Sequence, residues 1–285
     1  MQFEIKSRWT GAVIFTAEVE ADESASTGIK LGLAVKVAVK ARANLRDADL
    51  GGANLRDADL RDAYLGDADL RDADLGGANL RDADLGGAYL RDADLRGANL
   101  ARANLRDADL GGADLRDADL RDAYLGDADL RGANLARAYL RDADLRDADL
   151  RDADLGGANL RDADLRDADL GDAYLGDANL RGANLARAYL RDAYLNGTCG
   201  LNEWIKNIQV EDWPISYTSE VMQIGCQRHS FDAWRNFSDA EIRAMDGRKA
   251  LDFWRKWKSW IFQTIEMAPA KPTKAADPVE TEAAE

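Results

Sequence analysis

Alanine and leucine recur with polar residues in a five-residue phrase, Ala-x-Leu-x-x, that fills more than half of the chain. The phrase occurs 31 times without a break, over residues 41–195. On an α-helix successive leucines would be rotated by about 140° and would form no apolar stripe. In one long strand the odd period would place alternate leucines on opposite faces. We therefore expect the chain to turn after every phrase, with each short extended piece pointing its Ala and Leu to the same side.

The two residues between each Leu and the next Ala are suited to turns. Arg-Asp is the commonest pair, and every glycine of the block lies in one of these pairs. Gly and Asp adopt unusual backbone dihedrals at low cost. A chain that turns the same way after each phrase winds into stacked coils around a shared interior of Ala and Leu, which is a solenoid. This pattern predicts the solenoid and leaves the number of sides per coil open.

The run ANLRDADLGGANLRDADL at residues 43–60, and the phrases after it, resemble the pentapeptide-repeat proteins, whose motif is A(D/N)Lxx. The resemblance implies a mainly β fold, a right-handed quadrilateral parallel β-helix with four phrases per coil and with Leu and Ala inside. The 31 phrases then form just under eight coils, a rod about 37 Å long at the ordinary strand spacing. Internal duplication does not fix the coil length. Residues 41–70 recur at an offset of 60 with one change, but residues 126–140 recur at an offset of 50.

Residues 1–40 are expected to cap the first coil. The segments QFEIKSR and GAVIFTAEVE flank residues 9–11 and predict a β-hairpin. The valines of segment 28–41 favour a strand, whereas its alanines and its two lysines four residues apart allow a helix. Similar Ala-Val-Lys segments precede the repeats in some family members, and this favours a short helix.

The composition changes after Leu195, and six of the seven tryptophans lie beyond it. We expect a small Trp-rich α+β domain at residues 196–268 that closes the other end of the rod. Ser238 followed by Glu241 is a capping-box signature for a short helix that ends near Gly247. The next segment places five apolar residues on one helical stripe: Leu251, Trp254, Trp257, Ile261 and Ile265.

Two further features of this region concern its origin and its end. The pattern QIGCQRHS…W…F…MDG…AL.FW..WK, over roughly residues 220–267, resembles C-terminal segments of pentapeptide-repeat proteins of phage and prophage origin. This resemblance transfers no catalytic residue. The composition of residues 269–285 is typical of a disordered tail.

The tryptophans of the last helix have two interpretations. They are either the core of the small domain or, as Trp254, Trp257 and Trp260 beside Arg and Lys, a surface for a partner or a second copy of the chain. The sequence therefore leaves open whether the chain forms a homo-oligomer.

The acidic charge is concentrated in the rod. Residues 41–195 carry 34 Asp and 22 Arg, a net of −12 out of −15 for the whole chain. With four sides per coil, residues 20 apart lie above one another, and one side then carries an acidic ladder at its middle outward position: Asp49, Asp69, Asp109, Asp129, Asp149 and Asp169. Tyrosine replaces Asp or Asn at seven middle positions, and Tyr174 is expected to stack against Tyr194 on the adjacent coil.

Some pentapeptide-repeat proteins bind DNA gyrase as acidic mimics of duplex DNA, so the resemblance implies gyrase, or another DNA-binding enzyme, as a candidate partner. DNA carries about one charge per 1.7 Å of axis, or roughly 22 over a rod of this length. The rod has a net charge of −12 with arginines mixed in. A soluble surface with many salt bridges explains that charge equally simply, and mimicry therefore ranks second.

Catalytic chemistry finds little support in the sequence. His229 is the single histidine, and together with Cys226 it supplies two ligands where a zinc site needs three or four. Cys199 would join them only if the fold happened to bring it close. Carboxylates spaced along a convex rod offer no cleft that would shift their pKa values. We expect no catalytic, cofactor-binding or metal-binding residue and no cofactor, and an enzyme ranks third.

The sequence thus predicts a noncatalytic structural or binding protein, in which an acidic rod presents a C-terminal protein-interaction domain. The expected interaction surface comprises the six ladder aspartates with Trp254, Trp257 and Trp260. The partner is a protein of open identity, and no direct contact with nucleic acid or membrane is expected. With no signal peptide and no apolar stretch near 18 residues, the chain is predicted to be soluble and cytoplasmic.

Overall fold

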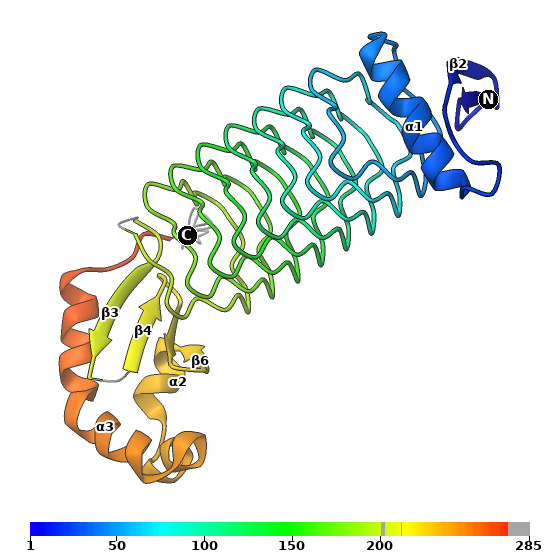
Figure 1. Cartoon of the computed structure of the whole chain (residues 1–285). Coiled ribbons are helices and arrows are strands. Elements are labelled where there is room, and N and C mark those ends of the chain that lie inside the picture. The colour runs from blue at the N-terminus through cyan, green and yellow to red at the C-terminus, as the bar shows by residue number, and fades with distance from the viewer. Residues whose placement is uncertain (201–202, 212, 273–285) are drawn as a thin grey trace, which may run out of the picture.

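The computed structural model describes residues 1–200, 203–211 and 213–272. A long solenoid of similar coils forms the middle of the molecule (Figure 1). Strands β1 (Gln2–Lys6) and β2 (Val13–Glu18) and helix α1 (Thr27–Lys40) lie at one end of the solenoid. A sheet and two helices lie at the other end, beyond the last coil.

Each coil of the rod has four sides of five residues. Parallel bridges join residues 20 apart along the rod, beginning with Asn44 and Tyr64. Between coils, the amide of Leu110 donates to the carbonyl of Asp129 at 2.7 Å, and the amide of Asp129 donates to the carbonyl of Ala108 at 2.9 Å. The same two hydrogen bonds recur along the rod. The offset of 20 residues resolves the coil length, which duplication in the sequence left open.

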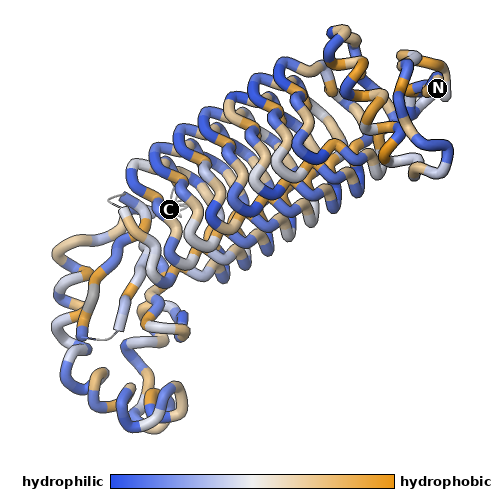
Figure 2. Tube along the Cα trace, viewed as in Figure 1, coloured by the Kyte–Doolittle hydropathy of each residue, from blue (hydrophilic) through white to orange (hydrophobic). Residues whose placement is uncertain are grey.

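The interior consists of leucine and alanine. The repeat leucines from Leu45 to Leu195 are buried, and Leu190 is the most exposed of them at 8%. Hydrophilic residues recur along the outside of the coils (Figure 2). Burial of a leucine side chain contributes roughly 1.5–3 kcal/mol, so this regular interior is the main source of the rod's stability.

The second residue of every turn has a left-handed backbone. From residue 42 to residue 192 all 31 of these positions have positive φ, and Asp, Gly or Arg occupies each of them. The turn closes when the next alanine amide donates to the preceding leucine carbonyl, as from Ala123 to Leu120 at 3.1 Å. Gly and Asp tolerate this conformation better than most residues, which explains their abundance at the corners.

The solenoid continues one side beyond the last Ala-x-Leu phrase. Cys199 forms a parallel bridge with Asn179, and Thr198 takes the buried place of the alanine. The Thr198 hydroxyl donates to the carbonyl of Leu195 at 2.8 Å. The expected boundary at residue 195 is therefore too early, because Thr198 and Gly200 replace the Ala and Leu by which the phrase is recognised.

The hairpin β1–β2 covers one side of the first coil. The two strands pair antiparallel, as predicted. At the end of β1 the carbonyl of Lys6 accepts from the amide of Asp49 at 2.8 Å, and the amide of Arg8 donates to the carbonyl of Asp47 at 2.8 Å. These bonds satisfy backbone groups that no preceding coil can reach.

Helix α1 covers the next side, which confirms the prediction of a helix over strand in segment 28–41. Its glycines allow a close approach, since the carbonyl of Gly28 accepts from the amide of Asn54 at 2.9 Å. A methyl group at Gly32 would overlap the carbonyl oxygen of Asn54. The pair Gly28 and Gly32, four residues apart, thus forms the face of α1 that rests on the first coil.

The C-terminal domain is an α+β structure around its own core. Strands β3 (Lys206–Val210), β4 (Trp213–Tyr217), β5 (Val221–Ile224) and β6 (Gln227–Ser230) form an antiparallel sheet in chain order. The sheet is followed by helices α2 (Phe231–Asn236) and α3 (Asp239–Met267).

Helix α3 begins and bends at the residues that the sequence indicated. Ser238 and Glu241 form the predicted capping box at its start. At Asp246 and Gly247 the backbone leaves the helical conformation, and the helix then resumes. The predicted disordered tail, residues 269–285, begins too early, because Ala270 is buried in the core of the domain and the amide of Lys271 donates to the carbonyl of Glu203 at 2.6 Å. The rest of the predicted tail, from residue 273 onward, lies outside the described residues.

Polar contacts join the last coil to the C-terminal domain. The buried Gln223 side chain accepts from the amide of Leu195 at 3.0 Å. The Ser216 hydroxyl donates to the carbonyl of Leu195 at 2.9 Å. Arg228 donates to the carbonyl of Leu190 at 3.0 Å and pairs with Asp192 at 3.3 Å. Apolar packing contributes as well, because Ile205 and Trp204, which precede β3, pack on the core of the rod, whereas the core of the C-terminal domain is a separate cluster. Hydrogen bonds and these two apolar side chains therefore close the end of the rod together. Among the described residues no helix has both the length and the apolar character needed to cross a membrane.

Candidate interaction surfaces

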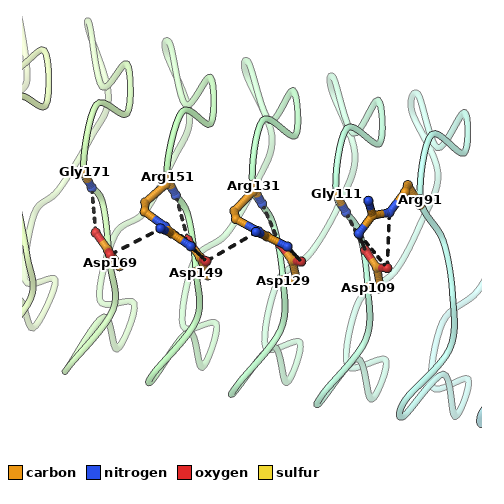
Figure 3. Close-up of polar contacts among 9 residues, drawn as sticks. All are labelled: Arg91, Asp109, Gly111, Asp129, Arg131, Asp149, Arg151, Asp169 and Gly171. Carbon is orange, nitrogen blue, oxygen red and sulfur yellow. Dashed lines mark hydrogen bonds and ion pairs between the residues drawn. The ribbon is translucent and has the colours of Figure 1, made fainter.

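The acidic ladder lies on one side of the rod, but arginines interleave with it (Figure 3). The guanidinium of Arg131 donates to Asp129 at 2.8 Å and lies 3.5 Å from Asp149 on the next coil. Arg151 contacts Asp149 at 2.8 Å and Asp169 at 3.7 Å in the same way. The ladder is therefore a row of alternating charges rather than a row of free carboxylates.

The same interleaving continues toward the start of the rod. Arg91 contacts Asp109 at 3.1 Å, and Arg71 pairs with Asp69, which is only 5% exposed. Asp49 is the first member of the ladder and is exposed. It lies beside the hairpin, where its backbone amide donates to the backbone carbonyl of Lys6.

The ladder carboxylates also hold the turns. The Oδ1 atom of Asp129 accepts from the amide of Arg131 at 3.1 Å, and that of Asp169 accepts from the amide of Gly171 at 2.9 Å. On another side the Asn99 side-chain oxygen accepts from the amide of Ala101 at 3.1 Å. Asp and Asn share this acceptor, which explains why either can occupy the middle position of the phrase.

Hydrogen bonds from arginine lower the pKa of several ladder aspartates. The Arg131 guanidinium lowers the pKa of Asp129, and the Arg151 guanidinium lowers the pKa of Asp149. These carboxylates are ionised at neutral pH, but their charge is already met by a partner, so they attract a further ligand only weakly.

Unpaired acid lies at the corner beside the ladder, a feature that the sequence analysis missed. We define the acidic side by its middle residues, every twentieth position from 49 to 189, together with the turn after each. It carries eleven aspartates and five arginines. The opposite neutral side has middle residues at every twentieth position from 59 to 199 and carries seven of each with its turns. Four exposed turn residues of the acidic side form no ion pair with any described residue: Asp72, Asp92, Asp152 and Asp172. The charges on each side could be counted from the sequence, but the sequence does not show which carboxylates an arginine reaches.

The three candidate tryptophans do not form one surface. Trp254 is 4% exposed and belongs to the core of the C-terminal domain, so its assignment to an interaction surface is wrong. Trp257 is half-buried against that core, and its ring contacts the ring of Trp260 with centroids 5.7 Å apart. Only Trp260, 43% exposed, presents a large apolar area. The predicted apolar stripe of α3 exists, but over most of its length it packs in the core of the domain rather than facing solvent.

The single histidine packs among aromatic rings. His229 meets Trp234 and Phe237 edge to face, with centroids 5.3 and 4.8 Å away. Burial lowers the pKa of His229, and its Nε2 atom has no hydrogen-bond partner. Cys199 and Cys226 are exposed free thiols. Within residues 1–200, 203–211 and 213–272, no three His, Cys, Asp or Glu side chains are grouped as a metal site would require.

Comparison with known proteins agrees with this geometry. The family model for pentapeptide repeats matches in eight copies over residues 41–77, 78–117, 118–157 and 158–197. A search among curated proteins finds no match.

Several solved structures are similar to this chain, and two of the three described below are pentapeptide repeat proteins. One is HetL, a pentapeptide repeat protein involved in heterocyst differentiation regulation from Nostoc sp. strain PCC 7120, with 41% identity, a TM-score of 0.29, and coverage of 53% of this chain and 75% of its own. Another Nostoc pentapeptide repeat protein, alr5209, is 46% identical over 32% of this chain and 72% of its own, with a TM-score of 0.29. QnrB1, a plasmid-mediated fluoroquinolone resistance protein, is 20% identical over 54% of this chain and 79% of its own, with a TM-score of 0.32.

The family match ends near the last bridge of the rod and does not extend into the C-terminal domain. It spans the coils whose four-sided bridges and buried leucines are described above, and the solenoid is therefore a right-handed β-helix. On these grounds the chain belongs to the pentapeptide-repeat family.

Proposed function

We propose that this chain is a noncatalytic binding protein whose rod presents an acidic corner to a basic partner protein. One observation carries the proposal: the acidic side has six more aspartates than arginines, whereas the opposite side is balanced. Solubility requires charge on the surface, but it does not require one side of the rod to be more acidic than the opposite side. The asymmetry makes this side the most negative of the four and the one that attracts positive charge most strongly.

The turn aspartates of the acidic side are the contacts we assign to the partner. Asp72, Asp92, Asp152 and Asp172 are exposed, and their carboxylates have no ion-pair partner among the described residues. Charged groups of this kind mainly steer association and set its specificity, and salt weakens them. In this proposal the N-terminal cap and the C-terminal domain hold the two ends of the scaffold closed.

Two matched variants of the full chain test the proposal. The first replaces the four corner residues, Asp72, Asp92, Asp152 and Asp172, with Asn. The second makes the same number of Asp→Asn changes on the neutral side, at Asp62, Asp122, Asp142 and Asp162. Asn tolerates the left-handed turn position, so both variants should fold and both lose four negative charges.

The readout is mass spectrometry of proteins captured from a bacterial lysate at low and at high salt. We expect a basic protein on the unmodified chain and on the neutral-side variant at low salt only, and its loss from the corner variant. Equal capture by the two variants, or capture that resists salt, would contradict the assignment.

Mimicry of DNA toward gyrase is the second candidate. The row of corner carboxylates along the rod favours it, but the net of six charges on that side is far below the roughly 22 of a DNA duplex of similar length. Inhibition of gyrase supercoiling at low micromolar protein, lost in the corner variant and kept in the neutral-side variant, would support mimicry. Undisturbed supercoiling at tenfold higher protein would exclude it.

Recognition by the C-terminal domain is a third assignment that the same capture experiment separates. Trp260 is the most exposed of the three candidate tryptophans of α3. A partner that is lost on Trp260→Ala and retained by the corner variant would place the contact on α3 and leave the rod as a spacer.

A further inference from the structure

A pocket of about 240 Å³ lies in the C-terminal domain, apart from the acidic side of the rod. It opens between the β5–β6 turn at Cys226 and the bend of α3 at Asp246. Four aromatic residues line it together with aliphatic side chains such as Ile224 and Ile242: Trp213, Trp234, Phe253 and Trp254.

The rings of the wall pack in two pairs. The centroids of Trp213 and Phe253 lie 5.5 Å apart, and those of Trp234 and Trp254 lie 5.0 Å apart. The Trp234 indole N–H donates to the carbonyl of Met222 at 2.7 Å, which fixes that ring. The wall is therefore already in place before a ligand enters.

Among the described residues that line the pocket, Asp246 is the only charged one. Its side chain is exposed and forms no ion pair with a described residue. It stands at the bend, where the non-helical backbone of Asp246 and Gly247 separates the two parts of α3. A carboxylate at the mouth of an aromatic pocket favours a positive ligand, because the ring faces are also electronegative.

Cations already lie over rings of the same aromatic cluster. The Lys258 Nζ atom is 5.4 Å from the Trp254 ring centroid, and the Arg235 guanidinium carbon is 4.7 Å from that of Phe262. Neither Lys258 nor Arg235 is among the residues that line the pocket. Both distances are within the range of cation–π contacts.

We propose that this pocket binds an alkylated ammonium group. A methylated ammonium carries its charge behind an apolar surface, so it can lose water and still contact ring faces. A primary ammonium would lose strong hydration and find few acceptors in this wall. A neutral apolar group would fill the pocket but leave the Asp246 carboxylate without a role. The volume lies below the roughly 300–1,000 Å³ of pockets for larger ligands, which suits a head group.

Titration of the full chain with choline, followed by tryptophan fluorescence, tests the proposal. The neutral isostere 3,3-dimethylbutanol has the same shape without the charge. We expect saturable binding of choline and about threefold to thirtyfold weaker binding of the isostere, the range that cation–π contacts produce. Equal binding of the two compounds, or no saturable change with choline, would overturn the proposal.

Variants locate the site. Asp246→Asn should weaken choline binding and leave isostere binding unchanged, whereas the matched Asp252→Asn on the exposed face of α3 should change neither. Ala250→Leu adds bulk within the lining and should abolish binding, with circular dichroism as the check on folding. Binding that survives in folded Ala250→Leu would place the cation elsewhere and overturn the assignment.

A peptide with one trimethyllysine separates two sources of the ligand. Tighter binding of the peptide than of choline would identify a modified protein side chain as the source. Tighter binding of choline would identify a free metabolite. Either result requires the same pocket, and loss of both in Ala250→Leu is expected.

Discussion

Tyr174 and Tyr194 stack face to face on adjacent coils, with ring centroids 4.8 Å apart and planes 11° from parallel. The coil repeat of 20 residues places the two rings above one another, as the sequence predicts. The Tyr194 hydroxyl also accepts from the side-chain amide of Asn196 at 3.1 Å. The stack lies at the end of the rod, next to the coil that meets the C-terminal domain.

We expect this stack to stabilise the last coils. In a double-mutant cycle with Tyr174→Asn and Tyr194→Asn, the coupling energy should be about 0.5–1.5 kcal/mol, the usual value for an aromatic pair. Asn is a native residue at other middle positions, where its side-chain oxygen accepts from a turn amide, so Asn is compatible with the coil at both sites. Chemical denaturation gives the four free energies of unfolding. Additive effects would mean that the rings lie together without a gain in stability.

Replacing Gly32 with Ala should detach α1 from the first coil. Alanine favours a helix over glycine by about 1 kcal/mol, but its methyl group would overlap the Asn54 carbonyl. We expect a net loss of about 1–3 kcal/mol from the overpacking. Faster hydrogen exchange in residues 1–40 is the measurement. The control is Ile29→Ala on the exposed face of the same helix, which should leave the exchange almost unchanged.

The left-handed corners predict an unusual order of substitutions at Asp152, whose φ is 59°. Asp152→Ala should lower the free energy of unfolding by about 1 kcal/mol, because a Cβ atom without a local hydrogen bond is disfavoured there. Asp152→Gly should be nearly neutral, since glycine meets no steric penalty. Urea unfolding of the two variants decides the order. An alanine variant more stable than the glycine variant would contradict the role of the turn.

Gln223 should be essential to the junction between rod and C-terminal domain. Its side chain accepts from the Leu195 amide and donates to the Gly225 carbonyl, each at 3.0 Å. Gln223→Met keeps the length of the side chain but leaves these buried groups unsatisfied, a cost of about 1–3 kcal/mol. We expect cleavage near residue 200 in limited proteolysis. The matched Gln227→Met on the neighbouring strand should remain resistant.

His229 predicts a pH dependence for the C-terminal domain. Burial lowers its pKa in the folded state below the unfolded value near 6.5. The unfolded state therefore binds the proton more readily, so this contribution to stability is complete above about pH 6.5 and is lost as the pH falls through the folded pKa.

The measurement is urea unfolding followed by tryptophan fluorescence between about pH 7.5 and pH 5. Most carboxylates keep their charge in that range, so the decline should depend mainly on His229. In His229→Asn the free energy of unfolding should vary much less with pH. A decline of equal size in that variant would point to other groups.

Periodicity made the rod predictable, but the charges on it were not. A period of five with Ala and Leu two residues apart admits few structures, and the resemblance supplied four sides. The position of Asp129 on the ladder followed directly from that geometry. Its pairing with Arg131 did not, because the same sequence allows the guanidinium to reach its own coil, the next coil or solvent.

The C-terminal domain shows the corresponding limit for apolar residues. The helical stripe through Trp254 and Ile261 was evident from spacing, and both residues are buried. Spacing alone does not say whether such a stripe meets a sheet of the same chain or another molecule. The answer depended on β3–β6, whose strands are short and carry no clear alternation.

The 20-residue register has a consequence for how such a rod changes in length. Removing four consecutive phrases takes out one coil and leaves every remaining side chain on its own side, as the offset of 60 between residues 41–70 and 101–130 already illustrates. Removing a single phrase instead moves all later residues to the neighbouring side, so the C-terminal domain is carried around the rod relative to the N-terminal cap. The number of phrases thus sets the direction in which the two ends of the molecule face, independently of any residue at either end.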